Sequence, residues 1–212
     1  SVSLIQTVVQ ESGVPVIETG SGVVHIYVDA SADRDKAIEI IHNSKVQRPS
    51  VCNAVETVLI HREILGDLAP TLSGRLTDSG VTLHADEEFR KIEPGAAPAL
   101  EEDWEREYLS MDLAVKTVSG IDEAIEHIRL HSSHHTESIV TEDLANAERF
   151  LSEVDSAVVM LNASTRFTDG GEFGFGAEVG ISTQKLHARG PMGLPELTST
   201  KWIVRGQGQI RP

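Results

Sequence analysis

The sequence is poor in cysteine and in cations, and it has no long apolar run. A single cysteine, Cys52, stands among 212 residues, so no disulfide can close within the chain. A reducing compartment, the cytoplasm, is therefore expected. No apolar run approaches the ~18 residues that span a bilayer, so no membrane helix is expected. The first residues hold no basic segment followed by an apolar core, so no signal peptide is expected either.

Cations are outnumbered by acidic residues. The chain has 18 lysines and arginines against 33 aspartates and glutamates, a formal net charge of −15. An acidic surface repels a phosphate backbone, so nucleic acid is not an expected partner. The chain does not begin with methionine, and its first methionine is Met111. It is therefore expected to be a processed or shortened piece of a longer protein.

Helical and strand-like patterns alternate along the chain. Acidic residues 86–103 are expected to form an exposed connection. The periodicity predicts helices over residues 3–12, 29–43, 64–74, 121–130 and 143–154, and strands over residues 14–18, 23–28, 57–61, 81–84, 113–118, 138–141 and 157–162. This alternation predicts an α/β fold with a mainly parallel sheet. In such folds sites lie at the carboxyl ends of the strands, and the glycine-rich loop after residue 162 is expected there.

The only cysteine lies between two cations and a predicted strand. Lys45 and Arg48 precede Cys52, and nearby positive charge lowers the pKa of a thiol and so favours the nucleophilic thiolate. Free cysteines are also among the most buried residues in proteins. Composition therefore leaves two interpretations open, a reactive thiol and a structural one.

Two other patterns point away from bound cofactors and metals. Gly174, Gly176 and Gly180 are spaced as GxGxxxG, which differs from the dinucleotide-binding GxGxxG. We favour a glycine-rich surface on which a substrate or another domain packs closely against the backbone, rather than a phosphate-binding loop. His131, His134 and His135 lack partners at ligand spacing, so a polar helix end is predicted and no metal site.

Two carboxylates remain ambiguous from the sequence alone. Glu18 precedes a glycine turn and follows a predicted strand, where burial can raise the pKa of a general base. It can equally be an ordinary turn residue. Glu107 is one charge in an acidic stretch, just before a predicted strand.

Three long strings resemble the gamma-glutamyl phosphate reductase family, in the aldehyde dehydrogenase superfamily. They are residues 43–53, 162–178 and 182–194, and the resemblance extends from near residue 1 to about Trp202. It implies a three-layer α/β/α catalytic domain with a mainly parallel sheet. It divides the chain into a remnant of a dinucleotide-binding domain (1–34), a catalytic thiol domain (35–180), and a return segment with an oligomerisation tail (181–212). Family members are longer, so the chain is expected to be their C-terminal half.

The resemblance also implies an activity and its residues. The expected reaction is the NADPH-dependent reduction of L-glutamate 5-phosphate to L-glutamate 5-semialdehyde and phosphate, in proline biosynthesis. Cys52 would be the nucleophile that forms a thioacyl intermediate, with Asn53 beside it near the oxyanion. Glu107 would lie near the nicotinamide ribose, with Glu18 also on the cofactor side. Candidates for holding the substrate's phosphate and carboxylate are Lys45, Arg48, Ser164, Thr165, Arg166, Lys185 and Arg189.

The expected partners are other copies of the chain and, functionally, a glutamate 5-kinase. Two alternatives stay open. The chain could be a catalytically incomplete piece that serves folding or assembly, with residues 200–211 added as a strand to a neighbouring sheet. It could also be another thiol-dependent acyl-transfer enzyme that needs no nicotinamide.

Overall fold

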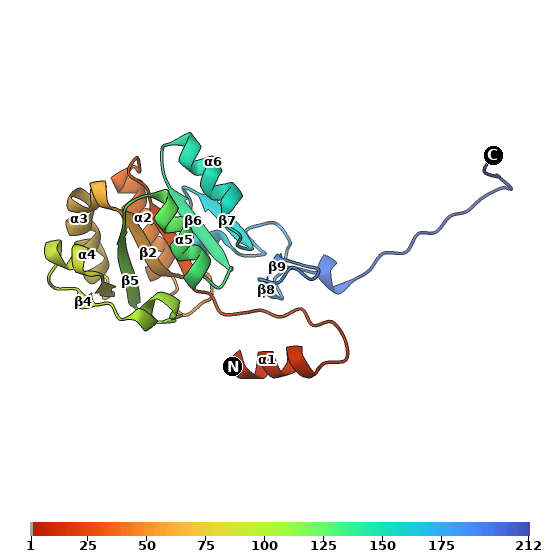
Figure 1. Cartoon of the computed structure of the whole chain (residues 1–212). Coiled ribbons are helices and arrows are strands. Elements are labelled where there is room, and N and C mark those ends of the chain that lie inside the picture. The colour runs from red at the N-terminus through yellow and green to blue at the C-terminus, as the bar shows by residue number, and fades with distance from the viewer. Residues whose placement is uncertain (1) are drawn as a thin grey trace.

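The computed structural model describes residues 2–212 as a sheet covered by helices, with the two ends of the chain reaching away from it (Figure 1). The strands are β1 (Val24–Val28), β2 (Val55–His61), β3 (Thr82–Ala85), β4 (Ala97–Pro98), β5 (Asp112–Val118), β6 (Thr136–Val140), β7 (Val158–Leu161), β8 (Gly180–Ser182) and β9 (Gly190–Met192). The α-helices are α1 (Val2–Glu11), α2 (Arg34–Val46), α3 (Leu65–Thr77), α4 (Glu87–Ile92), α5 (Ile121–His131) and α6 (Leu144–Glu153). Short 3-10 helices lie at Arg62–Ile64, Glu101–Glu105, Thr165–Phe167 and Pro195–Leu197.

Seven strands form one sheet in the order β4-β3-β5-β2-β1-β6-β7, and all its pairings are parallel. β8 and β9 form a separate antiparallel hairpin. The predicted α/β fold with a parallel sheet is therefore confirmed. β1 lies in the middle of this sheet, between β2 and β6. Residues 24–28, which the sequence analysis placed in the segment 1–34, are thus part of this sheet. The division of the chain into domains stays a prediction.

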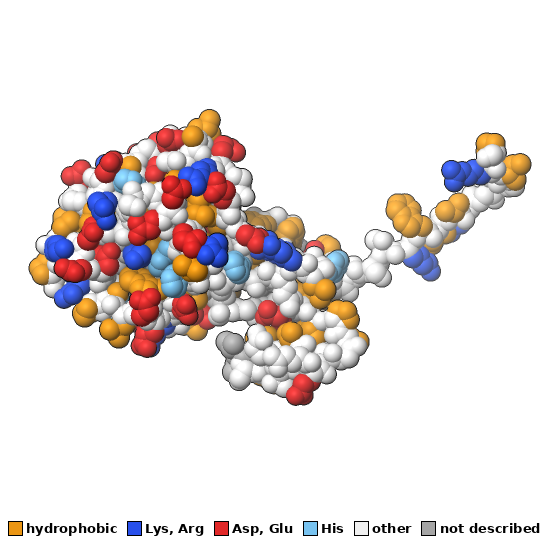
Figure 2. All heavy atoms as spheres, viewed as in Figure 1, with side chains coloured by type: hydrophobic (Ala, Val, Ile, Leu, Met, Phe, Trp, Pro, Cys, Tyr) orange, Lys and Arg blue, Asp and Glu red, His pale blue; other side chains and the backbone are white. Residues whose placement is uncertain are grey.

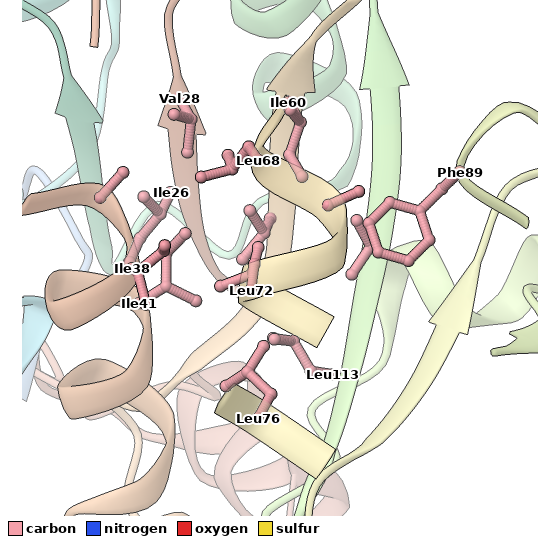
Figure 3. Close-up of a cluster of buried hydrophobic side chains, with 14 of the residues drawn as sticks. Ile26, Val28, Ile38, Ile41, Ile60, Leu68, Leu72, Leu76, Phe89 and Leu113 are labelled. Carbon is pink, nitrogen blue, oxygen red and sulfur yellow. The ribbon is translucent and has the colours of Figure 1, made fainter. Parts of the chain in front are cut away.

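Side chains alternate between the two faces of the sheet, and helices cover both. Ile26 and Val28 of β1 pack under α2 and α3 in the larger core, where Leu68, Leu72 and Phe89 are fully buried (Figure 3). Tyr27, between them in sequence, points to the opposite face and packs with Phe150 of α6. This is the period-two alternation of a strand buried on both sides, and it confirms the expected three layers.

Two segments differ from their sequence-based predictions. Residues 14–18 form no strand: no neighbouring strand pairs with them, and Val14 is exposed. Residues 86–103 are more than an exposed connection. The Asp86 carboxylate accepts the Phe89 N–H at 2.8 Å and begins α4, which buries Phe89 in the core. Trp104, just beyond, is also buried.

The ends of the chain expose apolar side chains. Leu4, Val8 and Val9 of α1 are exposed, and α1 lies apart from the sheet (Figure 1). Residues 198–212 run outward without regular structure and carry Trp202, Val204 and Ile210, each about nine-tenths exposed (Figure 2). Among residues 2–212, no helix has both the length and the apolar character to cross a bilayer.

Candidate active site

The candidate site lies at the amino ends of the central strands. Cys52 occupies the turn between α2 and β2, just before Val55. Gly22 comes just before β1, Glu107 precedes β5, and Thr136 begins β6. The amino ends of parallel strands meet at one edge of a sheet, which brings these segments together. The prediction of a site at the carboxyl edge is therefore wrong.

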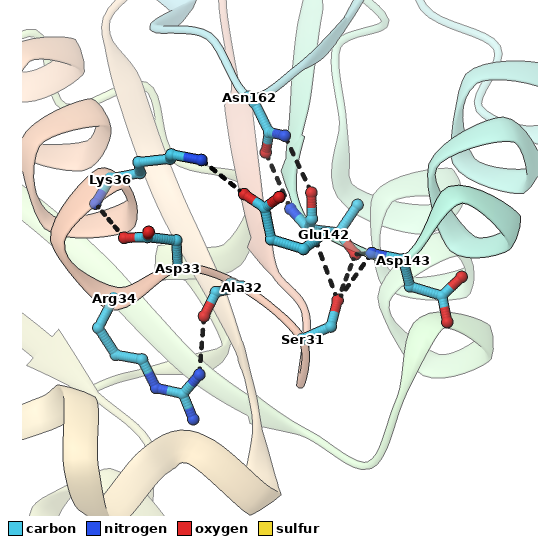
Figure 4. A network of polar contacts seen from close by, with 9 residues as sticks. Ser31, Ala32, Asp33, Arg34, Lys36, Glu142, Asp143 and Asn162 are labelled. Atoms are coloured by element: carbon cyan, nitrogen blue, oxygen red, sulfur yellow. Dashed lines mark hydrogen bonds and ion pairs between the residues drawn. The ribbon is translucent and has the colours of Figure 1, made fainter.

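The carboxyl edge of β1 and β6 is closed by hydrogen bonds within the chain (Figure 4). The Ser31 hydroxyl accepts the backbone N–H groups of Glu142 and Asp143 at 3.1 and 3.0 Å. The Asn162 amide bridges the Thr141 backbone, accepting its N–H and donating to its carbonyl at 2.9 Å each. The residues after β7 then run back across the molecule, because Thr165 and Thr168 contact the turn of Cys52 from the amino side of the sheet.

Cys52 is half-buried and packs directly on the turn before β1. A β-carbon at Gly22 would lie 1.7 Å from the Cys52 carbonyl oxygen, so only glycine fits there. The Gly22 N–H donates to Glu107 Oε1 at 2.7 Å. Glu107 therefore binds the residue that packs on the Cys52 backbone. Its place near the nicotinamide ribose stays a prediction.

The electrostatic environment of Cys52 favours the neutral thiol. Burial raises its pKa first, and the Glu178 and Glu107 carboxylates raise it further. Its own backbone N–H and the Arg166 guanidinium act in the opposite direction. The sequence analysis expected Lys45 and Arg48 to lower this pKa. The cation that does act on the thiol is Arg166, from the loop after β7.

Lys45 is instead part of a buried ion pair. Its Nζ lies 2.5 Å from Glu56 Oε2, and neither side chain has any exposed surface. Burial lowers the pKa of Lys45 and raises that of Glu56 to about 7. A side chain with no exposed surface cannot meet a dissolved substrate in this conformation. The prediction that Lys45 binds substrate is corrected on that ground.

Ser164 and Thr165 hold the loop after β7 against the turn of Cys52. Thr165 Oγ1 donates to the Asn53 carbonyl at 2.7 Å, and Ser164 Oγ donates to Asn43 Oδ1 at 2.6 Å. Both side chains are buried. Both anchor the loop, and their role as substrate contacts stays a prediction.

Asn53 is buried beside Cys52 and ties the same loop. Its amide nitrogen donates to the Thr168 carbonyl at 2.8 Å, while its Oδ1 has no hydrogen-bond partner among the described residues. The contact to Thr168 fixes the turn on the far side from Glu107. Its predicted place near the oxyanion stays a prediction.

Arg166 is the cation best placed for an anionic substrate. Its Nε donates to Gln47 Oε1 at 2.7 Å, and it lines a cavity of about 160 Å³ with Gln47, Asn43, Phe167 and Glu172. Burial and the nearby Arg48 cation lower its pKa. Two guanidinium groups that repel each other favour an anion between them. Arg48 and Arg166, two of the candidate substrate-binding cations, thus lie close enough to interact, and Arg166 also interacts with Cys52.

Glu178 is a site residue that sequence reasoning missed. Its Oε2 accepts the Gly170 N–H at 2.8 Å, and after burial it is the largest influence that raises the pKa of Cys52. The only signal in the sequence was its position inside a string that resembles the family. Nothing in its own spacing distinguished it from other surface carboxylates.

Lys185 and Arg189 lie elsewhere. Both contact the Asp155 carboxylate, Lys185 through Nζ and Arg189 through Nη1 at 2.8 Å, and they lower the pKa of Asp155 to about 2. Asp155 precedes β7, which is three strands from β2 in the sheet. At ~4.8 Å per strand this is roughly 14 Å from the Cys52 side. The structure does not bring these cations to the thiol, and their binding of substrate stays a prediction.

Glu18 also lies apart from Cys52. Its N–H donates to Gln184 Oε1 at 3.1 Å, and its side chain lines a cavity of about 190 Å³ between α1 and the turn at Gly20. No contact joins it to the thiol among the described residues. The structure thus gives no support to a base role, and a cofactor role stays a prediction.

The histidines form no metal centre within residues 2–212. His135 is buried, so the predicted polar helix end is wrong for this residue. Its burial lowers its pKa to about 4. A second buried histidine, His127 of α5, packs against His25, His131 and Trp104.

No family model matches the chain, but its sequence is similar to that of several known proteins. The chain is 67% identical over 211 residues to a gamma-glutamyl phosphate reductase from Leifsonia xyli, and 62% identical over 209 residues to one from Thermobifida fusca. These alignments cover 100% and 99% of this chain and 50% of each relative. The chain thus spans about half the length of these relatives. Its expected place in their C-terminal half stays a prediction, because coverage gives only a share of length.

Solved structures agree. A crystal structure of gamma-glutamyl phosphate reductase from Thermotoga maritima matches with a TM-score of 0.94 at 51% identity, covering 100% of this chain and 51% of that one. An acetylating aldehyde dehydrogenase from Geobacillus thermoglucosidasius matches with a TM-score of 0.71 at 17% identity, covering 98% and 56%. That second likeness shows a shared aldehyde dehydrogenase fold. Along its whole length, the chain is therefore similar in sequence and fold to about half of a gamma-glutamyl phosphate reductase.

Proposed function

We propose that this chain supplies the nucleophile for the NADPH-dependent reduction of L-glutamate 5-phosphate to L-glutamate 5-semialdehyde and phosphate. The supporting observation is the position of the only cysteine. Cys52 lies half-buried in a turn that Gly22, Glu107 and the loop after β7 hold from both sides. A thiol held this way on the framework of a parallel sheet suits covalent acyl transfer.

In this proposal the Cys52 thiolate attacks the acyl carbon of the substrate. A carbon–sulfur bond forms, the bond to the phosphate oxygen breaks, and phosphate leaves with the electron pair. The thioester that remains on Cys52 accepts a hydride and releases the aldehyde and the thiolate. Thiolate is both a strong nucleophile and a good leaving group, so it serves both steps.

The charged side chains around Cys52 would each act at a step of this reaction. Glu107 and Glu178 keep the resting thiol protonated, and Arg166 favours the thiolate. Arg48 and Arg166 would hold the substrate's anionic group, which relieves their mutual repulsion. The same pair would then stabilise phosphate as it leaves.

The residues present fit a nicotinamide cofactor at one point. Glu107 Oε1 accepts the Gly22 N–H, which leaves its second oxygen able to accept a ribose hydroxyl beside Cys52. NADPH, when bound, supplies the hydride. A GxGxxG phosphate-binding loop does not occur in this sequence, so this chain would contribute the carboxylate and not the dinucleotide-binding turn.

The test is turnover by a full-length protein that contains this chain. Cys52→Ala is expected to abolish the NADP-linked conversion of glutamate 5-semialdehyde and phosphate to glutamate 5-phosphate, while the circular dichroism spectrum and the melting temperature are retained. Glu142→Gln, which alters an exposed ion pair at the carboxyl edge, serves as the matched control and is expected to turn over normally. Retained turnover in Cys52→Ala overturns the proposal. A thiol acyltransferase would instead transfer the acyl group without NADPH.

The C-terminal segment favours a second function, assembly of the expected homo-oligomer. Trp202, Val204 and Ile210 are exposed on a segment that contacts little of the rest of the chain (Figure 1). Exposed apolar side chains in this number favour burial against another chain. Light scattering on the chain and on a version ending at Leu197 tests this. A smaller species after truncation supports the role, and an unchanged mass contradicts it.

A further inference from the structure

The buried ion pair of Lys45 and Glu56 has no part in the chemistry above, yet it lies next to the segment that carries Glu107. Glu56 Oε1 accepts the Leu109 N–H at 3.2 Å, while Oε2 meets Lys45 Nζ at 2.5 Å. Both oxygens of one buried carboxylate are therefore used. One holds a cation, and the other holds the backbone two residues after Glu107.

The held backbone is strained. Leu109 has φ of 54°, in the left-handed region that non-glycine residues adopt at a cost of roughly 1–2 kcal/mol. The adjacent Tyr108 is fixed as well: its hydroxyl donates to Asp103 Oδ1 at 2.9 Å and its ring stacks on His84 at 5.3 Å between centroids. Lys45 Nζ lies 5.8 Å from the same ring. The segment thus keeps one strained conformation because Glu56 and Lys45 hold it.

That conformation places Glu107 against the turn of Cys52. Glu107 accepts the Gly22 N–H at 2.7 Å, and Gly22 packs on the Cys52 carbonyl. A continuous series of contacts therefore runs from the buried pair to the backbone of Cys52, through Leu109, Glu107 and Gly22. Each link is a hydrogen bond or a backbone contact, so a change at Glu56 must move Glu107 or be absorbed by the strained backbone.

We propose that the Lys45–Glu56 pair is a positioning device that holds Glu107 beside Cys52 and so sets the reactivity of the thiol. The proposal rests on the proposed role of Cys52 as a nucleophile. Its test reads the thiol itself, so it can fail while Cys52-dependent turnover stands, and turnover can fail while the positioning stands.

Because Cys52 is the only cysteine, intact-mass labelling with iodoacetamide reports this one site. The key comparison is Lys45→Met/Glu56→Gln against Lys45→Met/Glu56→Leu. Both remove the two buried charges together, which avoids leaving one unpaired. Only the glutamine retains an oxygen that can accept the Leu109 N–H. Arg62→Met/Glu88→Leu removes an exposed pair and is the matched control.

Glu178 and Glu107 raise the pKa of Cys52, and Arg166 lowers it. Moving Glu107 away from Cys52 should therefore lower this pKa. In the leucine double variant the Cys52 labelling pKa is expected to fall, as it is also expected to do in Glu107→Gln. The glutamine double variant and the control are expected to label as the parent chain does. On a Glu107→Gln background the leucine change is expected to have no further effect on the labelling pKa.

Equal labelling pKa values for the two double variants overturn the proposal. It is also overturned if Lys45→Met/Glu56→Leu shifts the labelling pKa as much on the Glu107→Gln background as it does in the parent chain. A measurement on the parent chain covers the case in which the leucine variant does not fold. Amide hydrogen exchange at Gly22 and Leu109 is expected to show one shared opening free energy, because the contacts act together. Independent opening of the two amides contradicts the proposal.

Discussion

Gly22 and Cys52 are in backbone contact although thirty positions separate them in the sequence: a β-carbon on Gly22 would lie 1.7 Å from the Cys52 carbonyl oxygen. Two turns that precede neighbouring strands β1 and β2 thus share one space. The contact explains why the thiol sits at the amino edge of the sheet. It also makes the position of Cys52 depend on a residue that carries no functional group.

Gly22→Ala is therefore expected to displace the turn of Cys52. The new methyl group overlaps a backbone carbonyl, which cannot rotate away as a side chain can, so a loss of stability of roughly 1–3 kcal/mol is expected. Chemical denaturation measures the loss, and labelling of Cys52 reports the displacement. The control is Gly66→Ala in α3, where nothing lies within 4 Å of the new β-carbon and helix propensity favours alanine. Equal stability of the two variants would contradict the contact.

Removing an acidic or a basic neighbour of Cys52 is expected to shift its labelling pKa in opposite directions. Burial, Glu178 and Glu107 raise the pKa of the thiol above its ordinary value, so the parent chain should label fully only at alkaline pH. Glu178→Gln removes a negative charge and should lower the labelling pKa. Arg166→Gln removes a positive charge and should raise it. A labelling profile that neither variant moves contradicts the electrostatic account.

His127→Phe is expected to protect the chain against acid. Burial, followed by the nearby His25, His131 and Lys116, lowers the pKa of folded His127 to about 2. Its neutral form stabilises the fold above the unfolded value of ~6.5, and that stability is lost as pH falls from 6.5 toward 2. At pH 5 the loss is about 2 kcal/mol.

Phenylalanine fills the same space between Trp104 and His25, and His127 Nε2 has no hydrogen-bond partner within residues 2–212 to lose. The variant should match the parent chain in denaturant unfolding at pH 7.5 and exceed it at pH 5. His134→Phe, at an exposed position, is the control for adding an aromatic ring. A parent-like loss of stability at pH 5 in His127→Phe would show that this histidine is not the group that titrates.

Local patterns were enough to predict most of the fold. Alternating apolar periods place β1, β2, β5 and the helices between them close to where they lie, because each element buries a face that its own sequence encodes. The failures have physical causes. Residues 14–18 have strand-like composition but no strand beside them, and α4 depends on the Asp86 cap inside an acidic segment.

The site was harder to predict, because its contacts join distant positions. Cys52 and Glu107 were recognisable through family resemblance. The role of Glu178 and the burial of Lys45 against Glu56 arise only from folding. A lysine near a cysteine in sequence suggests a charged neighbour, yet the helix turns Lys45 inward, where a carboxylate neutralises it. The cation that acts on the thiol, Arg166, comes instead from the loop more than a hundred residues later.

The central claim is that Cys52 carries the acyl group. The most direct measurement is intact-protein and peptide mass spectrometry of a full-length protein that contains this chain, incubated with acetyl phosphate as an acyl phosphate probe, without nicotinamide cofactor. The account predicts one acyl group on the peptide that contains Cys52, removed by neutral hydroxylamine as a thioester is, and absent from Cys52→Ser. An acyl group on another residue, or none on Cys52, would contradict it.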